Sequence, residues 1–231
     1  MIRLELNVAP PVAVAYCDNV TRRFVSRNAH VVAVDDGSLT VGEGEVVVIA
    51  GPSGSGKSTM LSILGCLDRP TSGSVRVQEQ ELTLLGRGER RALRRRVVAS
   101  ILPQPSDNLF VGRSGVDNLR IAARQRDGAL ADVERVIDDI GIAGFVARAA
   151  GRMSGGEQQR LALACALVGG TPLVLADEPT GALDDASAEQ VVAAMLHATS
   201  RGATIVAATH DANVIAAATS VVRLEHGRRV A

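Results

Sequence analysis

Aromatic residues are scarce in this sequence of 231 residues, where they make up 2% of the chain and include no tryptophan. Proteins that hold single-stranded nucleic acid stack its bases on aromatic rings, so this scarcity argues against that class. The formal net charge is +0 at pH 7. A balanced charge provides no overall field that would attract nucleic acid. We therefore expect no nucleic-acid partner.

Cysteine is also rare, because the sequence contains only Cys17, Cys66 and Cys165, widely spaced. This pattern fits neither a disulfide framework nor a metal site, and it is typical of a reducing, cytosolic setting. No stretch of about 18 apolar residues exists that would predict a transmembrane helix. The run Val8–Tyr16 is broken by Pro10-Pro11 and lacks the features of a signal peptide. We expect it to form the first strand of an antiparallel sheet in a soluble protein.

What the sequence does contain is a strong phosphate-binding motif, GPSGSGKST. It follows Val46–Ala50, an apolar run typical of a buried strand, and precedes apolar residues at helical spacing. A strand, a glycine-rich loop and a helix start aim backbone N–H groups at an anion. We expect Lys57 to contact the β- and γ-phosphates of ATP and Ser58 to bind Mg²⁺. The predicted nucleotide-binding residues of this P-loop are Gly51, Pro52, Ser53, Gly54, Ser55, Gly56, Lys57, Ser58 and Thr59.

A second loop, MSGGEQQR, places two consecutive glycines at the expected start of another helix. Ser154 and Glu157 fit a capping box, which accounts for the local structure of this helix start. The box does not account for Gly155 and Gly156, because each glycine costs helix stability. Uncovered N–H groups at the positive end of a helix suit a second phosphate contact.

Two acids follow the apolar run Leu173–Ala176, namely Asp177 and Glu178. Ligands of parallel α/β sheets bind at the carboxyl ends of the strands, so these carboxylates should face the P-loop. One carboxylate suits the shell of a Mg²⁺ ion, and the next suits an attacking water. A further strand is predicted over Ala203–Thr209, and it leads directly to His210.

Together these motifs resemble those of the ATP-binding-cassette (ABC) ATPases. MSGGEQQR is similar to the LSGGQ signature of that family, and LVLADEPTGALDD is similar to its Walker B strand and D-loop. The resemblance covers essentially the whole chain and implies an α/β fold: a P-loop NTPase core with a mainly parallel sheet, an N-terminal antiparallel β subdomain and an inserted α-helical subdomain. Residues 1–44 would form the antiparallel part, 45–107 and 152–231 the core, and 108–151 the helical subdomain of a single domain.

The resemblance also implies roles for individual residues. Asp177 would support Mg²⁺, and Glu178 would act as the catalytic base. Lys57 would stabilise the charge of the γ-phosphate during catalysis, and His210 would contact the same phosphate. The signature of one subunit would close over the nucleotide of a second subunit. The residues expected at that interface are Ser154, Gly155, Gly156 and Glu157, together with Asp184 of the D-loop. Asp184 or Asp185 would also cap the following helix.

Two further residues are assigned by the same resemblance. Gln104, in ILPQPSDNLF, is similar to the Q-loop glutamine that senses Mg²⁺ and contacts the membrane partner. Phe24, at the end of DNVTRRF, is similar to the aromatic residue that stacks on adenine, and Tyr16 is the alternative. The departures from the family pattern are Pro103, Met153 and Cys165, the last at a position where relatives usually carry arginine.

Six arginines lie between Gly86 and Arg96, with Glu89 among them and no aromatic residue. Such a cluster favours a solvated helix face over a nucleic-acid site.

GPSGSGKSTMLSILGCLDRPTSG and LADEPTGALD look most like segments of lipoprotein-release and macrolide- or peptide-export subunits. The resemblance implies an ATP hydrolase that uses ATP and Mg²⁺ and forms an ATP-dependent homodimer. It would power a separate integral membrane permease and, through that permease, lie in the cytoplasm at the cytoplasmic face of the membrane. The alternative is a mechanical signalling ATPase that acts on a cell-wall or cell-division complex without moving a solute.

Overall fold

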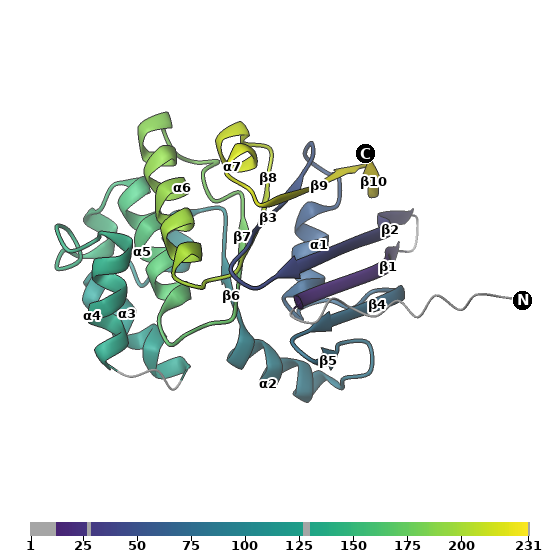
Figure 1. The fold of residues 1–231 in the computed structure, drawn as a ribbon, viewed down its shortest axis with the longest axis horizontal. Coiled ribbons are helices and arrows are strands. Elements are labelled where there is room, and N and C mark those ends of the chain that lie inside the picture. Colours follow the sequence, from purple (N-terminus) through teal and green to yellow (C-terminus); the bar gives the residue numbers. More distant parts are fainter. Residues whose placement is uncertain (1–12, 27–28, 127–129, 231) are drawn as a thin grey trace, which may run out of the picture.

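The computed structural model describes residues 13–26, 29–126 and 130–230. They form two β-sheets with helices between and beside them (Figure 1). The predicted fold class is confirmed, because a mostly parallel sheet, an antiparallel sheet and a group of helices are all present. Within the described ranges, none of the helices combines the length and apolar character that a membrane crossing requires.

The larger sheet has the strand order β10-β9-β3-β8-β7-β6. Its neighbouring strands are parallel except β9 and β10, which pair antiparallel at one edge. Every residue of β3 and β8 is buried, as expected for central strands of a parallel sheet that is covered on both faces. The strands are β3 (Val46–Ala50), β6 (Val98–Ile101), β7 (Leu173–Asp177), β8 (Ile205–Thr209), β9 (Ser220–Glu225) and β10 (Arg228–Val230).

The smaller sheet is antiparallel, with the order β2-β1-β4-β5. It consists of β1 (Ala13–Ser26), β2 (Ala29–Gly42), β4 (Ser72–Val77) and β5 (Gln80–Glu81). The strands β4 and β5 come from the segment 45–107 that the sequence assigned to the P-loop core, so the chain returns to the antiparallel sheet after its first helix. The expected strand Val8–Tyr16 lies partly outside the described residues, and β1 begins at Ala13.

The helices occupy three places. Helix α1 (Lys57–Leu64) lies between the two sheets, and α2 (Arg87–Val97) lies at the lower edge in Figure 1 and leads into β6. The remaining helices cover the other face of the larger sheet or stand beyond it. They are α3 (Gly115–Gln125), α4 (Leu130–Ile140), α5 (Gly155–Leu167), α6 (Asp185–Ser200) and α7 (Ala212–Ala216), with short 3-10 helices at Pro105–Asn108 and Ala150–Arg152.

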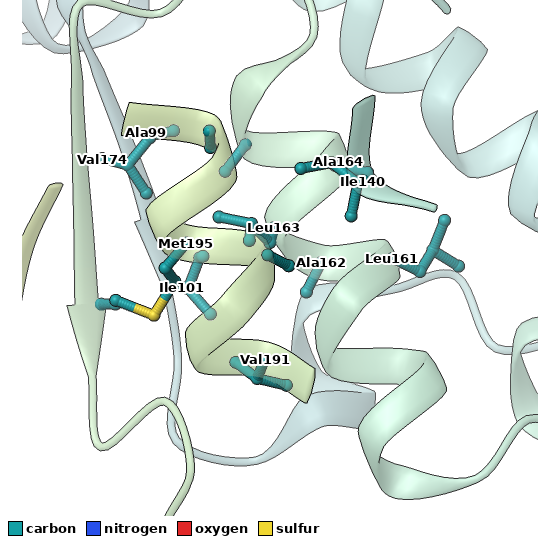
Figure 2. Packing of buried hydrophobic residues seen from close by; sticks show 14 of the residues in the cluster. Ala99, Ile101, Ile140, Leu161, Ala162, Leu163, Ala164, Val174, Val191 and Met195 are labelled. Carbon is teal, nitrogen blue, oxygen red and sulfur yellow. The ribbon is translucent and has the colours of Figure 1, made fainter. Parts of the chain in front are cut away.

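Two hydrophobic cores lie on opposite faces of the larger sheet. Val46 and Val48 of β3 join the core shared with α5 and α6, part of which is shown in Figure 2. Val47 and Ile49 join the core that contains α1 and the antiparallel sheet. Successive side chains of a strand point to opposite faces, so a shift of one residue would exchange the two sets. Because both faces of β3 are apolar, its register is defined by its pairing on two sides, with Val46 opposite Ile205 of β8 and Val47 opposite Ser220 of β9, which positions the loop that follows it.

Candidate functional site

The P-loop connects β3 to α1 and positions Lys57, whose side chain is buried. Lys57 Nζ donates hydrogen bonds to the carbonyl oxygens of Gly51 at 2.8 Å and Pro52 at 3.0 Å. It also lies 3.7 Å from Glu178 Oε1. The ammonium group is therefore held at the carboxyl end of the parallel strands, where the sequence predicted it.

The start of α1 has the features of an anion site. Its N-cap, Gly56, has no side chain that could cap the first N–H groups of the helix. Ser55 Oγ is buried and has no hydrogen-bond partner in the part of the chain that the structure describes. The oxygens of a phosphate group would accept hydrogen bonds from the first N–H groups of α1 and from the Ser55 hydroxyl, so these residues fit a bound nucleotide.

Two P-loop positions require glycine because the backbone of other strands comes very close. A Cβ atom on Gly51 (φ +154°) would lie 2.2 Å from the carbonyl oxygen of Leu224. One on Gly56 (φ +104°) would lie 2.2 Å from the carbonyl oxygen of Ala33. The backbone N–H of Gly227 also donates to the Ser55 carbonyl at 3.0 Å. The loop is thus held between the end of β9 and Ala33 within β2.

Asp177 ends β7, and its Oδ1 accepts a hydrogen bond from Ser58 Oγ at 3.1 Å. Burial raises the pKa of Asp177 above its ordinary value; the Ser58 hydrogen bond opposes this shift, and the neighbouring charge of Glu178 adds to it. The described residues contain no group of three or more metal-ligating side chains. Mg²⁺ commonly takes one or two protein oxygens and completes its shell with phosphate and water, so Ser58 and Asp177 fit a metal shared with a nucleotide.

Glu178 is held through both carboxylate oxygens. Oε2 accepts a hydrogen bond from Thr209 Oγ1 at 2.8 Å, and Oε1 lies 3.1 Å from His210 Nδ1. Thr209 is fully buried at the end of β8, whereas the side chain of His210 is 71% exposed. Glu178 itself has a left-handed backbone (φ 45°), which is uncommon for a residue with a side chain. The arrangement presents a fixed carboxylate that can accept a proton from water.

Gln104 lies on the same edge of the sheet as Asp177. Strand β6 runs parallel to β7 with Ile101 opposite Ala176, and the chain reaches Gln104 three residues later. Gln104 is exposed, and its backbone carbonyl accepts a hydrogen bond from Asn108 Nδ2 at 3.1 Å. Its role toward Mg²⁺ stays a prediction.

Phe24 and Tyr16 lie near opposite ends of strand β1. Phe24 is 42% exposed and pairs with Val31 of β2, close to the part of β2 that borders the P-loop. The guanidinium carbon of Arg22 lies 4.4 Å from the centre of its ring. Tyr16 instead lines a cavity with Thr204, which precedes β8 at the opposite edge of the parallel sheet. This placement favours Phe24 as the adenine-side residue, and the stacking itself stays a prediction.

The second loop forms the capping box that its sequence predicts. Ser154 Oγ accepts from the N–H of Glu157 at 3.2 Å, and Glu157 Oε2 accepts from the N–H of Ser154 at 2.9 Å. Burial acts to raise the pKa of Glu157, but the Ser154 hydrogen bond and the ion pair with Arg148 bring it below its ordinary value. Among the described residues, no hydrogen bond or ion pair joins this loop to the P-loop of the same chain.

Gly156 has a packing role that the sequence did not reveal. A Cβ atom there would lie 2.7 Å from Ser187 Cβ of α6. Asp184 is the N-cap of α6, and its Oδ1 accepts from the N–H of Ser187 at 2.8 Å. Of the two acids proposed as caps, Asp184 therefore makes the contact. The start of α5 and the first turn of α6 pack against each other at this point.

The structure adds two residues that the sequence interpretation missed. Thr209 orients Glu178, and its place as the last residue of a buried strand, directly before His210, was the available signal. Arg126 Nη1 donates to the carbonyl oxygen of Cys165 at 3.0 Å. A guanidinium from the end of α3 thus lies beside the position that departs from the family pattern.

Comparison with known proteins identifies the family. Residues 34–181 match the sequence model of the ABC transporter family. The chain belongs to this family. The geometry of the P-loop, the acidic strand end and the signature loop agrees with that membership, and the predicted resemblance is confirmed.

Two relatives of this ABC protein are export proteins. It is 40% identical over 217 residues to the macrolide export ATP-binding/permease protein MacB 1/2 of Paracoccus denitrificans, covering 92% of this chain and 32% of that protein. It is 36% identical over 218 residues to the probable syringafactin export ATP-binding/permease protein SyfD of Pseudomonas syringae pv. syringae, covering 93% and 33%. The chain thus spans about a third of the length of these relatives.

Solved structures of ATP-binding cassettes share the fold. The dimeric post-hydrolysis state of the cassette MJ0796 bound to ADP and Pi has a TM-score of 0.81 at 31% identity, covering 94% of this chain and 97% of that one. The structure of cbiO1 from Clostridium perfringens has a TM-score of 0.85 at 21% identity, which supports the fold alone.

Proposed function

We propose that this ABC chain binds ATP with Mg²⁺, hydrolyses the γ-phosphate bond and powers a membrane permease of an export system. One observation carries the proposal. The P-loop ammonium group, the Ser58–Asp177 pair and the Glu178–His210 pair meet at the carboxyl edge of a single sheet. This is where α/β folds bind their ligands, and a nucleotide, a metal and a water each find matching groups there.

Each of these groups has one part in the reaction. Lys57 stabilises negative charge on the β- and γ-phosphates, and Glu178 accepts a proton from the attacking water. His210 contacts the γ-phosphate beside that carboxylate. Bound Mg²⁺ neutralises phosphate charge, and Ser58, Asp177 and Gln104 are the residues that would hold it.

A second copy of the chain completes the site. In the described structure no hydrogen bond or ion pair joins the signature residues Ser154–Glu157 to the P-loop of their own chain, yet they present a helix start suited to phosphate. The dimeric state of the similar cassette MJ0796 supports a dimer in which each signature covers the other chain's nucleotide. Two-fold symmetry then produces two equivalent ATP sites.

The permease would dock beside the Q-loop and the helical segment 108–151, which carries α3 and α4 as the proposed helical subdomain. Among the described residues of this region, the exposed large apolar side chains are Leu102, Phe110 and Val111. Relatives named as combined ATP-binding/permease proteins support such a partner. Docking would hold this chain at the cytoplasmic face of the membrane.

The test is calorimetric titration of the folded protein with ATP and Mg²⁺. The Lys57→Ala variant should lose tight ATP binding and hydrolysis, because it removes the compact positive charge at the phosphates. Arg124→Ala, which removes an exposed cation from α3, is the matched control and should bind ATP like the wild type. A folded Lys57→Ala protein with wild-type affinity would refute the proposed site.

A further inference from the structure

The surface of α2 is unusually basic. It carries six arginines within ten residues. Arg87, Arg91, Arg95 and Arg96 are exposed, whereas Arg90 and Arg94 are half-buried on the side of Leu93 and Val97, the two buried residues of the helix. Arg69, in the turn after α1, reaches the same place, because its Nη2 donates to the carbonyl oxygen of Leu85 just before α2. We call this surface the α2 basic face; its residues are Arg69, Arg87, Arg90, Arg91, Arg94, Arg95 and Arg96.

The charge of the α2 basic face is not balanced inside the protein. In the residues that the structure describes, none of its arginines lies in an ion pair. The nearest acids have other contacts: Glu89 Oε2 accepts from the Gly86 N–H at 2.7 Å, and Asp68 pairs with Arg22 at 2.7 Å. The pKa of Arg90 is lowered, first by burial and then by repulsion from the charge of Arg69. Like charges held together disfavour the folded state unless a partner compensates them.

Apolar side chains border the face and indicate what that partner is. Leu84 is 82% exposed directly before α2, and Leu67 is 58% exposed beside Arg69. A basic helix bordered by leucines fits the headgroup region of a bilayer, where cations meet phosphate and apolar groups meet acyl chains. Nucleic acid fits less well, since no aromatic residue stands within the basic segment to stack on bases.

The position of α2 agrees with a nearby bilayer. Strand β6 joins the helix to the Q-loop, and its four residues span about 13 Å. The Q-loop is where the permease would dock according to the proposed function, so the present inference rests on that function. We propose that the α2 basic face binds anionic phospholipid headgroups of the membrane beside the permease.

The experiment is co-sedimentation of the full chain with vesicles. The chain should bind vesicles of mixed phosphatidylglycerol and phosphatidylcholine, bind pure phosphatidylcholine weakly, and release from the anionic vesicles as salt is added. The triple variant Arg87→Gln, Arg91→Gln, Arg95→Gln should bind the anionic vesicles about a hundredfold more weakly. Glutamine is a good helix former, so α2 should persist.

A matched triple variant removes the same charge elsewhere. Arg124→Gln, Arg223→Gln and Arg229→Gln are exposed positions outside the α2 basic face, and this protein should bind vesicles like the wild type. The single reversal Arg91→Glu gives a second test if the triple variant folds poorly, with an expected loss of more than tenfold. Equal binding to neutral vesicles, absence of vesicle binding, or equal losses in both triple variants would overturn the proposal. Preferential binding of duplex DNA that displaces the vesicles would overturn it as well.

The outcome can be separated from that of the proposed function. The α2 triple variant should bind and hydrolyse ATP like the wild type in the absence of vesicles. The Lys57→Ala protein should still bind anionic vesicles, because its change lies outside the α2 basic face. Loss of ATP binding in Lys57→Ala together with vesicle binding in the same protein would support both conclusions independently.

Discussion

At the scale of single residues, the amino-acid composition alone draws attention to the lysine of the P-loop. Lys57 is the only lysine of the sequence, and the other Lys/Arg positions are all arginine. The two side chains are not interchangeable, because lysine carries a compact ammonium on a flexible stem and arginine a wide planar fork. The buried place of Lys57 between two P-loop carbonyls suits the compact group. The sequence alone therefore pointed to this position, although the two carbonyl contacts required the structure.

Replacing Asp177 should separate stability from function. The raised pKa shows that the folded protein disfavours the ionised carboxylate, chiefly through burial. Asp177→Asn should therefore raise the melting temperature of the nucleotide-free protein at neutral pH. The difference should shrink as pH falls through the raised folded-state pKa and vanish below the ordinary carboxyl pKa, where the wild-type group is protonated both folded and unfolded. Calorimetric scans across pH measure this, and a variant less stable than the wild type at neutral pH would contradict it. Mg²⁺-dependent ATP hydrolysis should be lost.

The two aromatic candidates should differ in phenotype. Phe24→Ala should weaken ATP binding by about 1–3 kcal/mol if the ring stacks on the base. Tyr16→Ala should leave affinity unchanged and lower stability, because Tyr16 lies at the opposite edge of the sheet. Nucleotide titration and thermal melts of both variants distinguish the outcomes. Reversed phenotypes would show that the adenine lies near Tyr16.

At the scale of elements, local signals predicted local structure well. Strand β3 has the predicted bounds Val46–Ala50, and the capping residues Ser154 and Asp184 both make their caps. Pairing between distant segments was not predictable in this way. The return of β4 to pair with β1 depends on contacts between residues far apart in the chain, and no turn or periodicity near Ser72 encodes that partner.

The two glycines at the second position of α5 and α2 should respond in opposite ways to alanine. Gly156→Ala should destabilise the protein by about 1–3 kcal/mol, since its Cβ would press against Ser187. Gly88→Ala should stabilise it by about 0.5–1 kcal/mol, because nothing lies within 4 Å of the added carbon. Denaturant titrations give both values. If Gly156→Ala were as stable as Gly88→Ala, the close packing of α5 on α6 would be wrong.

At the scale of the whole molecule, the two phosphate-binding loops of one chain serve different nucleotides in the proposed dimer. Glu178→Gln keeps the shape of the side chain and removes the base that activates water. This variant should accumulate as an ATP-bound dimer in light scattering and return to monomer with ADP.

Adding Ser154→Arg supplies the control for that dimer. The long, positively charged arginine side chain at the signature loop should block association, while each monomer still binds ATP at its P-loop. A Glu178→Gln protein that remains monomeric with saturating ATP would count against the sandwich arrangement.

The contacts that hold the P-loop between β9 and β2 have a consequence for synthesis of the chain. Gly51 and Gly56 sit against the backbones of Leu224 and Ala33, and Gly227 donates to the Ser55 carbonyl. The loop motif emerges from the ribosome early, but the residues that shape it from β9 and the following turn emerge about 170 residues later, a delay of roughly ten seconds or more at common elongation rates. A nascent chain should therefore be unable to bind ATP until β9 has been synthesised. Nucleotide binding would follow the arrival of β9 at the loop and would not guide the earlier folding steps.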